Sequence, residues 1–315
     1  MPTFQFPRRA FLQLIPASLL NARDLKCDIA IIGGGVGGCA AAIAACRNGM
    51  RVVMTEETDW VGGQLTSQAV PPDEHPWIEA FGATALYRTY RSRVRQYYKE
   101  FLPLRAEVLA NAFFNPGGGS VSRLTHEPRV SLAVLEQMLS TWIGGGQLTV
   151  LLETKPISAE TAGDSVRSVT VRHSRSGKPA TIAASYFLDA TEQGDLLPLT
   201  KTEYVTGFES QKETGEPHAP DSAQPANVQS FTVCFAIDHL KGESHVIEKP
   251  TDYAFWREYV PRLKPAWPGK LLSWSMSNPI TLAERKVSFN PEPPYSVPAG
   301  NLNLWLYRRI AAQDQ

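Results

Sequence analysis

A run of five glycines within six positions, Gly33–Gly38, constrains the fold of this chain more than any other feature. The preceding segment, Lys26–Ile32, is typical of a β-strand, and alanine-rich helix formers follow the glycines. A second strand-like run, Arg51–Thr55, ends at the acidic residue Glu56. The order strand, glycine turn, helix, strand and acid is the context that gives a G-x-G-x-x-G motif its meaning. The sequence therefore predicts an α/β fold that opens with a dinucleotide-binding unit.

Each position of this unit has a chemical reason. Gly33 allows a tight turn, Gly35 lets the backbone approach a diphosphate, and Gly38 lets the helix pack closely on the sheet. The diphosphate is expected at the positive end of the helix, and Gly37 completes the predicted cofactor-binding glycines. Glu56 can accept hydrogen bonds from ribose hydroxyls, and its charge disfavours a 2′-phosphate. The alternative is an ordinary glycine-rich turn that binds no ligand.

A glycine doublet, Gly62-Gly63, follows Glu56 by six residues in the segment ETDWVGGQLTSQ. With this doublet the sequence resembles the FAD-dependent oxidoreductases of the glutathione-reductase-like flavoprotein fold. The resemblance implies that the doublet passes close to the FAD diphosphate, and it favours FAD over NAD. The residues it brings nearest to the flavin ring are Gln64, Thr66 and Ser67.

Later segments fit the discontinuous FAD domain that the resemblance implies. Leucines and other apolar residues at helical spacing predict an amphipathic helix over Val130–Trp142. Three strand-like runs then follow, Leu148–Leu152, Ser165–Arg172 and Thr181–Ser185. The apolar strand that comes next ends in Asp189-Ala190-Thr191 and resembles the strand that returns to the adenosine side of FAD in this family. The resemblance therefore implies that Asp189 and Thr191 bind the cofactor, whereas Glu192 departs from the family pattern, which has glycine there.

An insert at about residues 76–115 separates the doublet from the amphipathic helix. Apolar residues three and four apart predict a helix over Trp77–Phe101, and a row of basic residues forms another face of it. This row consists of Arg88, Arg91, Arg95 and Lys99. It is either a solvated helix face or a site for an anion. His75 and His126 lie in the flanking loops and are candidates for proton transfer, with a packing role as the alternative.

The composition changes after residue 199. Residues 207–225 are polar and rich in turn formers, and Phe231–Ile237 is a strand candidate. The resemblance implies a longer substrate domain and a late Gly-Asp segment, neither of which follows Gly300. We therefore expect residues 200–315 to form a partial α+β substrate or cap domain and the chain to be a truncated member of its family.

The N-terminus contains Arg8-Arg9 ahead of a short apolar run, which resembles a twin-arginine export signal over residues 1–24. This predicts a periplasmic or exported protein, with a cytoplasmic protein as the alternative. The uncharged stretch Ile29–Cys46 is broken by glycines, so no integral membrane segment is expected.

Composition narrows the function classes. Lys+Arg and Asp+Glu are both 31, so no bulk charge indicates a nucleic-acid partner. The four cysteines lack the spacing of a zinc or iron–sulfur site, so no metal is expected.

The predicted architecture is α/β, with a Rossmann-like FAD-binding domain of parallel sheet and β-meander over residues 25–199. The predicted function is an FAD-dependent oxidoreductase that transfers hydride from a small organic substrate to FAD, which an electron acceptor reoxidises. A dinucleotide-binding module without turnover and an NAD-dependent dehydrogenase are the alternatives.

Overall fold

The computed structural model describes residues 24–119, 122–229, 240, 242–262, 269–273, 275–277, 281, 283–286, 288–289 and 301–302. The chain divides into two compact units. The larger unit consists of Met1–Gly117 and Ser122–Tyr204, and the smaller unit consists of Gly118–Val121 and Val205–Gln315.

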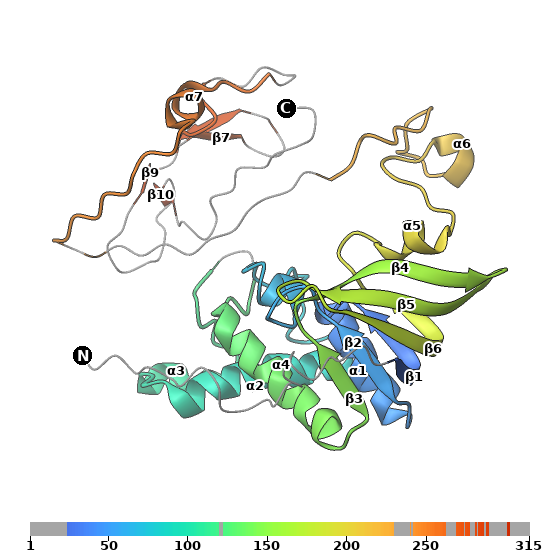
Figure 1. Ribbon diagram of the computed structural model, residues 1–315. Helices are drawn as coiled ribbons and strands as arrows, with labels where there is room; N and C mark the ends of the chain where they lie inside the picture. The colour runs from blue at the N-terminus through green and yellow to red at the C-terminus, as the bar shows by residue number, and fades with distance from the viewer. Residues whose placement is uncertain are drawn as a thin grey trace. The chain divides into compact units, whose positions relative to one another are not determined.

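A six-stranded sheet organises the larger unit (Figure 1). Its strands are β1 (Leu25–Ile32), β2 (Val52–Thr55), β3 (Leu148–Leu151), β4 (Thr154–Ala162), β5 (Ser165–His173) and β6 (Pro179–Asp189). They lie in the order β3-β2-β1-β6-β5-β4. Strands β3, β2, β1 and β6 pair in parallel, while β6, β5 and β4 form an antiparallel meander. The prediction of an α/β fold with a largely parallel sheet and a meander is confirmed.

Side chains of the central strands alternate between two buried clusters, one on each face of the sheet. Ile31 and Met54 pack with the helices α1 (Val36–Arg47), α2 (Ala85–Phe101) and α4 (Pro128–Gly144). Ala30, Ile32 and Val53 instead pack toward the meander and the short helix α5 (Leu196–Thr200). Because successive strand residues point to opposite faces, uninterrupted apolar runs are what a sheet covered on both sides requires. Two further short elements complete the unit, the 3₁₀ helix η2 (Gly63–Leu65) and α3 (Ala106–Ala110).

Several expected element boundaries need correction. The helix predicted over Val130–Trp142 is confirmed as α4, whereas the one predicted from Trp77 begins only at Ala85. Thr84 sets that start, because its side chain accepts a hydrogen bond from the backbone N–H of Tyr87. The separate strands expected on either side of Ser185 are one strand, β6. Strand β4 was not predicted, since its sequence TKPISAETA is polar and contains proline.

The smaller unit has only short elements in its described part. Helices α6 (Gln211–Thr214) and α7 (Tyr253–Glu258) are accompanied by the pairs β7 (Ser275–Ser277) with β8 (Glu284–Lys286) and β9 (Ser288–Phe289) with β10 (Asn301–Leu302). Ser210 and Glu213 form a capping box at the start of α6. The strand candidate Phe231–Ile237 lies outside the described residues, as does the signal-like segment before residue 24.

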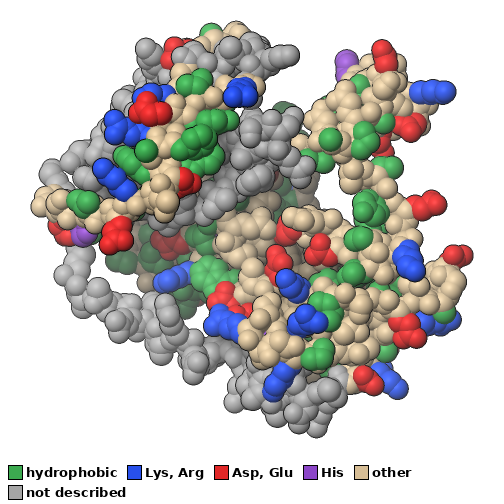
Figure 2. Space-filling view, turned by 45° about the horizontal axis from the view of Figure 1, so that its top comes forward, with side chains coloured by type: hydrophobic (Ala, Val, Ile, Leu, Met, Phe, Trp, Pro, Cys, Tyr) green, Lys and Arg blue, Asp and Glu red, His purple; other side chains and the backbone are tan. Residues whose placement is uncertain are grey.

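Acidic and basic side chains are interspersed over the face drawn in Figure 2. Within the described ranges, none of the helices has the length and the apolar character needed to cross a membrane.

Candidate functional site: a glycine-lined cleft at the sheet edge

A cleft of about 320 Å³ lies where β1, β2 and β6 end. These three strands are parallel, so the residues that follow their carboxyl ends meet at one edge of the sheet. The chain leaves β1 beside β2 on one side and β6 on the other, which is the switch point where open α/β sheets bind ligands. The cleft lies wholly within the larger unit.

The first glycine of the turn is required by close backbone packing. Gly33 has φ +108°, and a Cβ atom built on it would lie 2.1 Å from the carbonyl oxygen of Ala190. Its N–H donates to Oγ1 of Thr55 at 3.2 Å, and the N–H of Ala190 donates to the carbonyl of Ile32 at 2.7 Å. The ends of β1, β2 and β6 are thereby held together at the base of the cleft.

The helix that follows presents an uncapped N-terminus. Gly35 is the N-cap residue of α1, no side chain caps the helix, and its first turn contains no acidic residue. A Cβ atom on Gly35 would meet a single neighbour within 4 Å, Oε1 of Glu192 at 3.2 Å, so the space before the helix is open apart from one flexible side chain. Gly35 lines the cleft, whereas Gly37 and Gly38 do not. A Cβ atom on Gly38 would instead lie 2.0 Å from the carbonyl oxygen of Gly33, so this glycine packs against the turn.

Glu56 lies at the end of β2 and lines the cleft although only 5% of the residue is exposed. Its Oε1 accepts hydrogen bonds from the backbone N–H of Thr58 at 2.8 Å and from the Thr58 hydroxyl at 2.7 Å. Burial raises the pKa of the Glu56 carboxyl above its usual value, and the hydrogen bonds from Thr58 oppose that shift. The carboxyl group is thus held in a fixed orientation by its neighbour.

The glycine doublet lies against the first glycine turn. The N–H of Gly62 donates to the carbonyl of Gly34 at 2.8 Å, and Gly63 lines the cleft together with Ser67 and Gln68. Gln68 is a lining residue that the sequence did not indicate. The side chains of Gln64 and Thr66, both expected near the flavin ring, turn into their own loop instead.

The hydrogen bonds of these two side chains account for their position. Nε2 of Gln64 donates to the carbonyl of Pro71 and to Oδ2 of Asp73, each at 3.3 Å. The hydroxyl of Thr66 donates to the carbonyl of Val61 at 2.7 Å. Neither side chain lines the cleft, and both stabilise the loop that does.

The turn after β6 owes its shape to Asp189 and Thr191. Oδ1 of Asp189 accepts from the N–H and the hydroxyl of Thr191 at 3.0 and 2.7 Å, and Oδ2 accepts from the N–H of Leu196 at 2.9 Å. The Thr191 hydroxyl in turn accepts from the N–H of Asp195 at 2.8 Å. Thr191 lines the cleft but Asp189 does not, so the Asp-Ala-Thr sequence builds the turn that brings Glu192 to the cleft.

Strand β4 supplies the cleft residues that sequence reasoning missed. Thr154, Lys155 and Pro156 line the cleft, and the N–H of Thr154 donates to the carbonyl of Glu56 at 2.8 Å. Strand β4 could not be recognised from its polar sequence.

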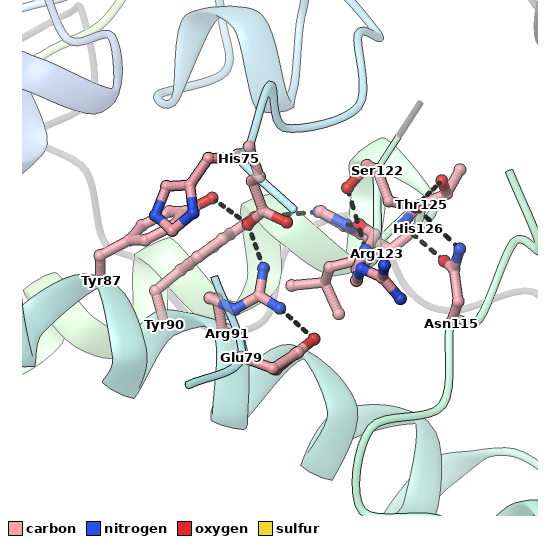
Figure 3. A network of polar contacts seen from close by, with 12 residues as sticks. His75, Glu79, Tyr87, Tyr90, Arg91, Asn115, Ser122, Arg123, Thr125 and His126 are labelled. Carbon is pink, nitrogen blue, oxygen red and sulfur yellow. Dashed lines mark hydrogen bonds and ion pairs between the residues drawn. The ribbon is translucent and has the colours of Figure 1, made fainter. Parts of the chain in front are cut away.

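The two histidines considered for proton transfer do not line the cleft. Figure 3 shows His126 within a polar network beside helix α2. Its Nδ1 lies 2.6 Å from the carbonyl oxygen of Leu124, which can only accept, so Nδ1 carries the proton and Nε2 accepts from the Tyr90 hydroxyl at 2.9 Å. Burial lowers the pKa of His126. His75 accepts at Nδ1 from the N–H of Trp77 at 3.2 Å and packs against the rings of Trp77 and Phe81.

The basic row expected on the insert helix is partly buried, which corrects its interpretation as a solvated face or an anion site. Arg91 and Arg95 are 3% and 6% exposed. Arg91 pairs with Glu74 and with Glu79, and its contact with Glu79 is drawn in Figure 3. Nη1 of Arg95 donates to Glu79 at 3.2 Å. Internal carboxylates therefore neutralise these two guanidinium groups.

Among the described residues, no three His, Cys, Asp or Glu side chains lie close enough together to hold a metal ion.

Comparison with known proteins identifies the family but not a close relative. The family model described as FAD dependent oxidoreductase matches residues 28–313. No curated protein matches the chain. Solved structures match only remotely, and the first three are covered over 23%, 33% and 34% of their own lengths.

Three of these structures illustrate the range. The L-proline dehydrogenase from P. horikoshii is 19% identical, with 54% of this chain and 23% of that chain covered and a TM-score of 0.29. THI4 from Thermovibrio ammonificans is 16% identical, with 63% of this chain and 76% of that chain covered and a TM-score of 0.33. The glycerol-3-phosphate dehydrogenase from Bacillus halodurans, complexed with FAD, is 15% identical, with 53% of this chain and 34% of that chain covered and a TM-score of 0.33. None of these similarities carries a substrate over to this chain. The family match, in contrast, extends over most of the sequence, and the chain belongs to the FAD-dependent oxidoreductases, a family of enzymes whose cofactor is FAD.

Proposed function

We propose that the cleft binds the ADP half of FAD and that the enzyme transfers hydride from a small organic substrate to the bound flavin. One observation supports this proposal: three groups meet in one cleft. They are the uncapped N-terminus of helix α1, the glycine at position 35 and the carboxyl group of Glu56. A diphosphate and a ribose need these groups, in the order in which the chain supplies them.

The residues present fit the diphosphate of FAD. A Cβ atom on Gly35 would project into the space before helix α1, so glycine leaves room there for the ligand to approach the backbone. The N–H groups of the first turn of α1 have no side-chain cap and can donate to phosphate oxygens. Gly63 lines the same cleft directly beside Gly35, because a Cβ atom on Gly63 would lie 3.2 Å from Cα of Gly35.

The adenosine would lie on the side of the cleft formed by Glu56 and β4. The orientation that Thr58 imposes on Glu56 suits it to accept hydrogen bonds from the ribose hydroxyls. Thr154, Lys155 and Pro156 form the adjoining wall, since Thr154 is hydrogen-bonded to the backbone of Glu56. The flavin would then extend past Gly63, Ser67 and Gln68.

When bound, FAD supplies the two-electron chemistry of the reaction. The residues of this chain bind and orient it, and we assign the proton-transfer role to neither His75 nor His126, because neither lines the cleft. His126 instead accepts a hydrogen bond within the buried network. An electron acceptor that reoxidises the flavin is part of the same proposal.

The proposal is tested on the purified full chain by absorbance and by mass spectrometry of the released ligand. We expect a band at about 450 nm from oxidised flavin, which bleaches when a substrate or reductant is added. Folded, colourless protein that binds ADP would instead favour a binding module without turnover. Tighter binding of NADH than of FAD would favour the NAD-dependent alternative.

A further inference from the structure

The side chain of Glu192 lies in the space that the proposed function assigns to the diphosphate. Its Oε1 is 3.2 Å from the position of a Cβ atom on Gly35 and 2.7 Å from that of a Cβ atom on Gly63. Glu192 lines the cleft, and its carboxylate makes no hydrogen bond or ion pair with the rest of the described chain. A carboxylate therefore lies against both backbone segments that an FAD diphosphate would contact.

The charges around the cleft explain why a carboxylate is stable there. Helix α1 carries a partial positive charge at its N-terminus, and neither a side-chain cap nor an acidic residue of its own first turn offsets it. Glu192 reaches this end of the helix from the turn after β6, where Asp189 and Thr191 fix the backbone. Glu192, which is distant in the sequence, thus places a negative charge at the N-terminus of α1, whose own first turn has none.

The same placement opposes a second anion. Among the described residues that line the cleft, Glu56, Glu57, Glu192 and Asp195 are acidic and Lys155 is basic. Of the four carboxylates, that of Glu192 lies against both glycine segments. A diphosphate could bind the backbone N–H groups there only if the Glu192 side chain moved out or tolerated a like charge at short range.

We propose that Glu192 is an internal anion that competes with the diphosphate beside Gly35 and Gly63 and lowers the affinity of the protein for FAD. This inference rests on the proposed function of the cleft. It makes Glu192 a determinant of cofactor affinity, and it predicts that FAD exchanges more readily in this protein than in a variant without the charge.

The test measures the Kd of the full ligand-free chain for FAD, by quenching of flavin fluorescence, and for ADP, by calorimetry. E192Q keeps the size of the side chain and removes its charge, and E192A removes both. E57Q is the matched control, because Glu57 is an exposed carboxylate of the same cleft that is not in contact with Gly35 or Gly63. We expect E192Q and E192A to bind both ligands about tenfold more tightly, which corresponds to about 1.4 kcal/mol, and to retain more flavin through purification.

The outcomes separate this inference from the function on which it rests. Tightening by E192Q that exceeds that of E57Q at least about fourfold supports a local competition rather than a general charge effect. Equal effects of the two variants, an unchanged Kd in E192Q, or weaker binding in E192Q would overturn the inference and leave the FAD site intact. If neither the natural chain nor any variant binds FAD or ADP, both proposals are wrong.

Discussion

The hydroxyl group of Tyr90 on helix α2 lies 2.9 Å from Nε2 of His126, in the loop that leads into helix α4. The same hydroxyl lies 2.6 Å from Oγ of Ser131 in the first turns of α4. Because His126 is protonated at Nδ1, Tyr90 donates to His126 and accepts from Ser131. This chain of hydrogen bonds links the insert to the helix that covers the sheet.

Acid should weaken this link through His126. Burial lowers its folded-state pKa below the ordinary value of 6.5, so the unfolded chain binds the proton first as the pH falls. The contribution of His126 to the free energy of unfolding is complete above about pH 6.5 and declines below it, by up to about 1.4 kcal/mol per pH unit. Urea denaturation between about pH 7.5 and pH 5 measures the decline.

The variant H126Q isolates this effect, because glutamine can still accept from Tyr90 but does not titrate. Its free energy of unfolding should depend less on pH over the same range than that of the natural protein. An H126Q profile that falls as steeply as that of the natural protein would show that another group is responsible.

Removing Arg91 alone should destabilise the larger unit strongly. The Arg91 and Glu74 side chains are 4% and 2% exposed, and R91M would leave the Glu74 carboxylate buried without its cation. A broken buried pair typically costs about 3–5 kcal/mol, whereas replacement of both partners by apolar residues costs much less. Chemical denaturation should therefore find E74L/R91M more stable than R91M.

An exposed arginine of the same insert provides the control. Arg105 is 85% exposed at its side chain and lies 3.9 Å from Glu107. Such a pair contributes at most about 1 kcal/mol. If R91M were no more costly than R105M, the buried network would have no role in stability.

Local patterns in the sequence predict the glycine turn, its helix and the acid at the end of β2, because all three lie within one continuous βαβ segment. The same patterns fail for Arg91 and Arg95, whose burial depends on Glu74 and Glu79 in a loop that follows no helical period. They also fail for β4, because a polar strand is recognised by its pairing with β5 rather than by its composition. Contacts between distant segments, such as that of Glu192 with Gly35, become visible only when the fold is known.

The carboxyl group of Glu56 should lower the free energy of unfolding near neutral pH and strengthen the binding of FAD. Burial raises its folded-state pKa, so the native state holds the proton more strongly than the unfolded chain, and the stability this gives in acid is lost as the pH rises through the folded-state pKa. Above the folded-state pKa the ionised carboxyl group therefore lowers the free energy of unfolding, and E56Q removes this effect while its amide oxygen still accepts from Thr58.

We accordingly expect ligand-free E56Q to be at least as stable as the natural protein at about pH 7 and to bind FAD about tenfold more weakly, since a charge-assisted hydrogen bond to the ribose is lost. Thermal melts and flavin titration measure the two effects. A less stable E56Q with unchanged FAD affinity would mean that Glu56 has a packing role instead.

Export through the twin-arginine route is a proposal that depends on Arg8 and Arg9. Fusion of the first 25 or so residues to a reporter should direct it out of the cytoplasm, and R8K/R9K should abolish this. R23K makes the same kind of change outside the arginine pair and should have no effect. A reporter that is exported equally well with R8K/R9K would refute the proposal.

Two glycines of the first turn should respond in opposite ways to alanine. Gly35 has backbone angles that alanine tolerates, φ −61° and ψ −173°, and an added Cβ would meet only the flexible end of Glu192, so G35A should fold as the natural protein does. The same Cβ would project toward the proposed diphosphate and should weaken FAD binding at least about tenfold, because the second glycine of the motif is the position of closest approach.

Gly37 does not line the cleft, and a Cβ on it would meet nothing within 4 Å. G37A should therefore keep FAD affinity within about threefold and gain up to about 1 kcal/mol of stability from the helix propensity of alanine. Flavin titration of both variants, with thermal melts to verify folding, decides the matter: equal affinities for G35A and G37A would mean that the diphosphate does not approach α1 at Gly35.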